Sequence, residues 1–160
     1  MTGLLDPLKK MGAQPAGGTP PEALSKERYQ LAMLERDYPA AERLLREIPA
    51  ETFPRFEIGE HSKLTHEALL AVARGADATT VESALVAARE EIGKRLVETH
   101  DEAIRYGELG LIDAFRGRKE DAIREGRRGL ELTDYSVLEK NDAAANLALI
   151  YARTGKRTKR

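Results

Sequence analysis

The sequence predicts an all-α protein of about seven helices, and three observations indicate this class. Good helix formers (Ala, Leu, Glu and Arg) are abundant among the 160 residues. No segment shows the alternation of β-branched residues that is typical of strands. Apolar residues instead recur every three to four positions, the spacing that gives a helix one buried face. A chain of this length can form one domain with its own hydrophobic core.

Composition narrows the classes of function. Charged residues make up 33% of the chain, but the formal net charge is −1, so charge balance gives no general affinity for polyanions. The absence of cysteine excludes disulfide bonds and thiolate zinc sites. No apolar run is long enough for a signal peptide or a membrane span. We therefore expect a cytoplasmic protein that does not bind membranes.

The chain divides into a flexible N-terminal arm at 1–18 and a helical domain at 19–160. The arm ends in the Pro/Gly-rich stretch AQPAGG, which is typical of flexible segments. Leu4, Leu5 and Leu8 could form one helical turn against the domain, although termini are more often loose unless they are docked.

Four segments predict helix starts by the same chemistry, the capping box. A Ser or Thr hydroxyl accepts a hydrogen bond from the backbone N–H three residues later, and the Glu at that position accepts one from the N–H of the cap. The four segments are Thr19–Glu22, Thr79–Glu82, Thr99–Glu102 and Ser136–Glu139.

The periodicity then places the helices in order. We expect helices at 20–35, 39–48, 55–74 and 80–98, two more within 106–132, and a last one at 137–154. Pro49 and Gly75 end the second and third helices. The long fourth helix has a predicted buried stripe of Val81, Leu85, Ala88, Ile92 and Leu96.

The stretch 106–132 is the best-defined part of the prediction, with a tight turn at Gly117-Arg118 between two short helices. Gly costs roughly 1 kcal/mol against Ala inside a helix, so Gly110, Gly126 and Gly129 require a packing reason. Small residues let two helix axes approach closely. We therefore expect the two helices to cross where Gly110 meets Ala122.

This stretch resembles a tetratricopeptide repeat (TPR), in which an aromatic residue, a Leu-Gly pair, a turn Gly and a second-helix Ala follow in fixed order. The corresponding residues are Tyr106, Leu109, Gly110, Gly117 and Ala122. The segments ERDYPAAERLL (35–45) and NLALIYARTG (146–155) resemble parts of the same repeat. Residues 54–155 are also similar to repeat regions found C-terminal in large bacterial signalling proteins.

The resemblance implies a superhelix of antiparallel helix hairpins, with about three hairpins and a terminal capping helix. It also implies a non-catalytic scaffold that binds a protein or peptide on a concave face lined by the first helix of each pair. By matched spacing, the groove residues are Lys26, Gln30, Met33, Thr65, His66, Leu69, Leu111, Phe115, Asn146, Leu149 and Arg153. For any single one of them, ordinary surface or inter-repeat packing is at least as good an interpretation.

No enzyme, cofactor or metal site is expected. His61 and His66 are five residues apart, so on one helix they diverge and do not form a metal-binding pair. The charges at 89–98 alternate in sign at helical spacing, which predicts a solvated face and not an acid/base pair. No Gly-rich phosphate loop or nucleophile elbow is present.

Two alternatives remain for the partner. The last helix carries Leu149, Ile150 and Tyr151, whose exposure would drive weak homodimerisation. A nucleic-acid or phosphate surface at the basic turn 116–128 is less favoured, because stacking aromatic residues are missing there. The basic residues of that turn are Arg116, Arg118, Lys119, Arg124, Arg127 and Arg128.

Overall fold

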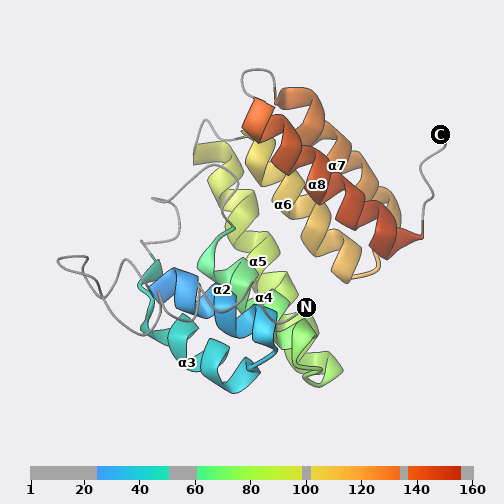
Figure 1. Cartoon of the computed structure of the whole chain (residues 1–160). Coiled ribbons are helices and arrows are strands. Elements are labelled where there is room, and N and C mark those ends of the chain that lie inside the picture. Colours follow the sequence, from blue (N-terminus) through green and yellow to red (C-terminus); the bar gives the residue numbers. More distant parts are fainter. Residues whose placement is uncertain (1–24, 51–60, 99–101, 134–136, 156–160) are drawn as a thin grey trace.

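The computed structural model describes residues 25–50, 61–98, 102–133 and 137–155, and over these ranges the chain forms seven α-helices and no strand. The all-α class is therefore confirmed for the described part of the chain (Figure 1). The helices are α2 (Ser25–Glu35), α3 (Tyr38–Glu47), α4 (Lys63–Ala73), α5 (Ala78–Glu98), α6 (Glu102–Phe115), α7 (Lys119–Leu132) and α8 (Val137–Thr154).

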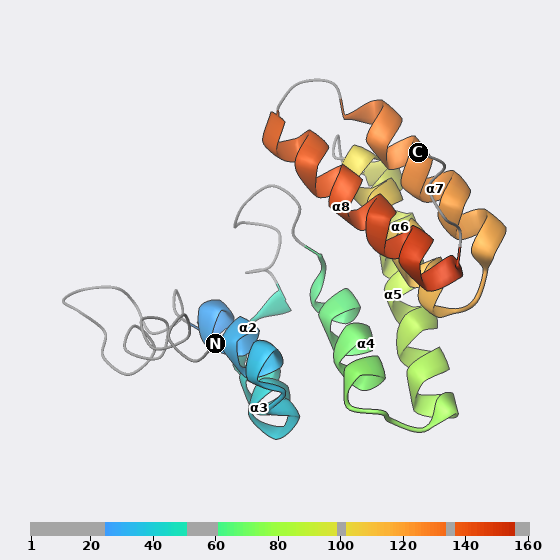
Figure 2. The same ribbon diagram turned by 45° about the vertical axis from the view of Figure 1, so that its right-hand side comes forward.

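The helices pack as successive neighbours. α2 packs on α3, α4 on α5 and α6 on α7, while α8 lies against both α6 and α7. Contacts between α3 and α4 and between α5 and α6 join each pair to the next, so the pairs follow one another across the molecule (Figure 2). At the first junction, the Lys63 ammonium donates a 2.7 Å hydrogen bond to the carbonyl of Ile48, just beyond the end of α3.

Three apolar clusters form the interior, and each unites elements that follow one another in the chain. The first lies between α2, α3 and α4 and consists of Tyr29, Ala32, Ala41, Leu45, Ile48 and Leu70. The second lies between α4, α5 and α6 and consists of Ala68, Leu85, Ala88, Ile92, Leu109 and Ile112. The third lies between α6, α7 and α8 and consists of Ala114, Ala122, Ile123 and Ile150. The predicted stripe of α5 is confirmed, since all five of its residues belong to the second cluster or pack against it.

Several helix starts differ from the predicted ones. α5 begins at Ala78, one residue before Thr79, because the Asp77 carboxylate accepts hydrogen bonds from both the backbone N–H and the hydroxyl of Thr80. The capping box at Thr79–Glu82 was therefore wrong. α4 begins at Lys63 behind its N-cap Ser62, later than the predicted 55. The arm at 1–18 and the boxes that begin at Thr19, Thr99 and Ser136 lie outside the described residues.

The crossing of α6 and α7 agrees with the prediction. A Cβ atom built on Gly110 would lie 2.8 Å from the carbonyl oxygen of Ala122 and 2.8 Å from the backbone nitrogen of Gly126. The two backbones touch here, which only glycine permits. The turn between them places Gly117 at φ +77°, the left-handed region that glycine enters without strain.

Candidate binding surface

Side-chain contacts link the first helices of successive pairs. The rings of Tyr29 on α2 and His66 on α4 meet edge to face, with centroids 5.4 Å apart. The Thr65 hydroxyl on α4 donates a 2.6 Å hydrogen bond to Oε1 of Glu108 on α6. These single side-chain contacts connect α2 to α4 and α4 to α6, although the three helices belong to different pairs.

The link between α6 and α8 is a cation–π contact. Cζ of Arg153 lies 4.7 Å from the ring centroid of Phe115, and both residues belong to the predicted groove. Asn146, another predicted groove residue, packs against the α6 backbone, since a Cβ on Gly107 would lie 3.5 Å from its Nδ2. We call the exposed and half-buried side chains of α2, α4, α6 and α8 the first-helix surface.

The predicted groove residues fall into three groups. Gln30, Leu149 and Arg153 are exposed, while Met33, His66, Leu69, Phe115 and Asn146 are half-buried. Thr65 and Leu111 are buried, with exposed fractions of 0% and 5%, so no partner can reach them in this structure. The side chain of Lys26 lies outside the described residues. Neighbouring elements bury α6 continuously from Gly107 to Ala114, so matched spacing did not predict that Leu111 is inaccessible.

A buried carboxylate beneath this surface holds the start of α4 against α6. Glu108 is fully buried, and its Oε1 accepts hydrogen bonds from the Ser62 backbone N–H at 2.8 Å and from the Thr65 hydroxyl. Its Oε2 accepts a 2.8 Å hydrogen bond from Nη1 of Arg105, which is also buried. This charge-assisted set satisfies the carboxylate on both oxygens. Sequence analysis missed it, although Arg105 and Glu108 stand at i, i+3 spacing within an apolar helix.

His61 lies beside this carboxylate. Its Nδ1 is 3.7 Å from Oε1 of Glu108, beyond hydrogen-bond distance. Burial lowers the pKa of His61; Glu108 acts in the opposite direction and Arg105 adds to the lowering. The expected divergence of His61 and His66 was wrong, since His61 precedes α4 and the two ring centroids lie 6.0 Å apart. The described residues contain no group of three or more His, Cys, Asp or Glu that could hold a metal ion.

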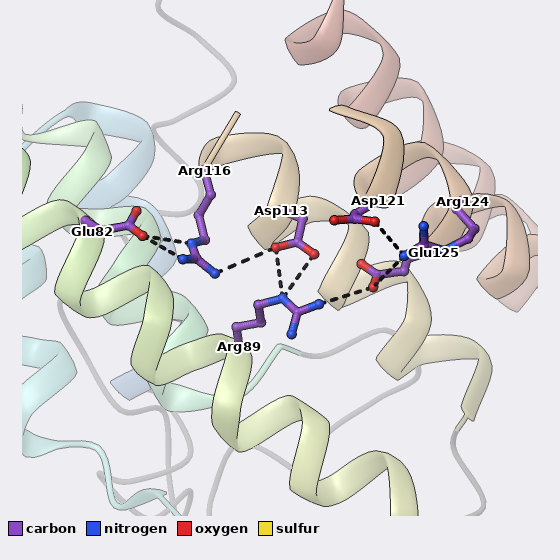
Figure 3. A network of polar contacts seen from close by, with 7 residues as sticks. All are labelled: Glu82, Arg89, Asp113, Arg116, Asp121, Arg124 and Glu125. Carbon is purple, nitrogen blue, oxygen red and sulfur yellow. Dashed lines mark hydrogen bonds and ion pairs between the residues drawn. The ribbon is translucent and has the colours of Figure 1, made fainter. Parts of the chain in front are cut away.

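A second buried charge cluster joins α5, α6 and α7 (Figure 3). Nε of Arg89 lies 2.9 and 3.0 Å from the two oxygens of Asp113, which is fully buried, and its Nη2 lies 3.4 Å from Oε1 of Glu125. Asp113 raises the pKa of Arg89 by accepting this hydrogen bond. The expectation of a solvated face was therefore wrong for Arg89, which instead ties three helices together.

Three of the six cations of the basic turn 116–128 lie close to a carboxylate. Arg116 lies 2.6 Å from Glu82, Arg124 lies 2.7 Å from Asp121, and Arg128 lies 3.7 Å from Glu131. The guanidinium of Arg127 donates a hydrogen bond to the hydroxyl of Tyr151. The carboxylates beside three of the six cations lower the net positive charge of this turn, which weakens the case for a polyanion surface there.

No protein-family model, curated protein or solved structure matches the chain. Within the described ranges, no helix has both the length and the apolar character to cross a membrane.

Proposed function

We propose that this protein is a non-catalytic, TPR-like helical repeat scaffold that binds a protein or peptide segment on the first-helix surface. One observation carries the proposal: Tyr29–His66, Thr65–Glu108 and Phe115–Arg153 join the first helices of successive pairs. Helix pairs stacked in this way present one continuous face built from several repeats, the type of surface on which repeat proteins bind extended partners. A cytoplasmic location, as in bacterial signalling proteins with similar repeats, belongs to the same proposal.

The surface offers both kinds of group that a partner needs. Leu149 is 56% exposed and supplies apolar area, while the guanidinium of Arg153 one turn later lies over the ring of Phe115. Half-buried His66 and Asn146 add polar groups with restricted mobility. Anchors that are already ordered lose less conformational entropy on binding than freely moving side chains.

The test is capture of partners on the immobilised full chain, followed by mass spectrometry and cross-link mapping. Specific partners should bind saturably and cross-link to α2, α4, α6 or α8. Leu149→Lys should abolish their binding, because it places a charge in the apolar part of the surface. The matched control is Glu131→Lys on α7, whose exposed side chain lies on a second helix. Binding that is lost in the control but kept in Leu149→Lys would contradict the proposal.

Self-association is the second candidate, and Leu149 is the observation that favours it. The prediction that Leu149, Ile150 and Tyr151 are all exposed was wrong, because Ile150 is fully buried in the third cluster and Tyr151 is half-buried. Leu149 at 56% and Leu34 at 68% are the large apolar side chains with the greatest exposure among the described residues. Contact between two copies would therefore involve Leu149 and not Ile150.

A further inference from the structure

The cluster of Arg89, Asp113 and Glu125 contains more buried negative charge than its arginine can neutralise. Asp113 is fully buried on α6, and Glu125 on α7 is 8% exposed. Among the described residues, Arg89 on α5 is the one whose guanidinium lies within 3.5 Å of both carboxylates. Two ionised carboxylates beside one guanidinium leave one net negative charge next to the fully buried Asp113, which is costly.

The other charged groups around Glu125 are mostly committed elsewhere. Arg124, on the same helix, is 3.9 Å from Glu125 but only 2.7 Å from Asp121. From α6, Arg116 is 3.9 Å from Asp113 and 2.6 Å from Glu82. From α8, the aliphatic side chains of Leu147 and Ile150 meet Gly126, and the Tyr151 hydroxyl accepts a hydrogen bond from Arg127. Oε2 of Glu125 is buried without a hydrogen-bond partner in the structure.

We propose that Asp113 and Glu125 hold one proton between them, and that this proton is a latch that fastens α7 to α5 and α6. With the proton on Glu125, its carboxyl O–H donates a hydrogen bond to the Asp113 carboxylate, and the three groups together are neutral. When Glu125 gives the proton to solvent, the site gains a negative charge beside Asp113. The ionised side chain then has an outlet, because Glu125 lines a hollow of about 930 Å³ along α7.

The latch works near neutral pH. The pKa of Glu125 is raised to about 7. Burial is the largest cause, the charge of Asp113 and a hydrogen bond with it add to the rise, and Arg89 and Arg124 oppose it. The native state therefore binds more protons than the unfolded state from roughly pH 4.5 to 7, since an unfolded Glu titrates at about 4.3. Stability from this group is complete below that window and is lost as the pH rises through it.

The experiment is a carboxyl ¹³C NMR titration of the full chain, combined with hydrogen exchange of α7 amides. We expect the Glu125 carboxyl to titrate near pH 7. The raised pKa of Glu125 should increase the equilibrium constant for local opening of α7 by up to about 30-fold between pH 5.5 and 8. This increase is measured after the intrinsic pH dependence of amide exchange has been subtracted. Glu125→Gln carries a permanent N–H donor toward Asp113, so it should abolish this pH dependence. Glu120→Gln, an exposed position lining the same hollow, should keep it.

Two results would overturn the latch. A Glu125 carboxyl that titrates near its ordinary value would show that no proton is held at neutral pH. An opening constant in Glu125→Gln that still rises with pH as in the parent would show that another group is responsible. The titration is made on the parent chain, so it decides the question even if the variant does not fold.

Discussion

Glu108 shows how a single buried side chain can position two helices. It accepts hydrogen bonds from the backbone before α4, from Thr65 and from Arg105, so its removal leaves three donors without an acceptor in the interior. Leaving an uncompensated buried charge is far more costly than losing a solvated pair. The carboxylate is thus a structural group that helps to position the first-helix surface above it.

We predict that Glu108→Ala lowers the free energy of unfolding by about 3–5 kcal/mol. The control is Glu42→Ala, which removes a pair with Arg74 whose side chains are 42% and 39% exposed. That pair is screened by solvent, so its loss should cost about 1 kcal/mol or less. Urea denaturation at pH 7 measures both changes, and equal effects in the two variants would contradict the assigned role of Glu108.

The prediction of individual residues failed mainly for charges. Alternating signs normally indicate a solvated helix face, and this holds for Glu90 and Lys94, whose side chains are exposed. Arg89 departs from the pattern because α6 and α7 bring Asp113 and Glu125 to it from distant parts of the chain. Periodicity describes one helix at a time, so it cannot show which polar residues a neighbouring helix will bury.

At the scale of the element, the α6–α7 hairpin depends on the absence of side chains. We predict that Gly110→Ala destabilises the protein by about 1–3 kcal/mol, because its Cβ would press on backbone atoms at 2.8 Å that cannot move independently. Gly93→Ala is the matched change, since nothing lies within 4 Å of that Cβ in the middle of α5. It should stabilise by about 0.5–1 kcal/mol through the gain in helix propensity.

Thermal denaturation of the two glycine variants measures these opposite signs. A Gly110→Ala protein as stable as its parent would mean that the α6–α7 crossing can open without cost. A destabilised Gly93→Ala protein would instead indicate that α5 has a neighbour at this position.

Element types were easier to predict than their starts. The last helix has the predicted bounds, 137–154, and the turn at Gly117 lies where the small residues placed it. The start of α5 was missed because Asp is as good an N-cap as Thr, and Asp77 stands two residues before Thr79. The choice of helices for the candidate surface stays a prediction. The side of the helix could not be predicted from spacing, because neighbouring helices bury Thr65 and Leu111.

At the scale of the whole molecule, the exposed side chain of Leu149 on α8 is an apolar surface on which two copies of the chain can associate. We predict a weak dimer of micromolar affinity, because ordering costs consume much of the gain from burying roughly a few hundred Å². Leu149→Lys should lower the average mass in concentration-dependent ultracentrifugation without changing helicity, whereas Ile150→Lys should unfold the third cluster. A parent chain that stays monomeric at several hundred micromolar would contradict the dimer.

The three apolar clusters imply that cooperativity decays along the molecule. No apolar cluster includes residues from all seven described helices. The cluster formed by α2 and α3 includes Leu70 of α4, and this residue is its main link to the other helices. In such a linear arrangement each unit is stabilised by its nearest neighbours, so the end units can open while the middle persists. Amides at 25–48 should exchange through a partial unfolding of lower free energy than those at 102–132. The chain would then behave as a series of coupled folding units, with an N-terminal pair that melts first.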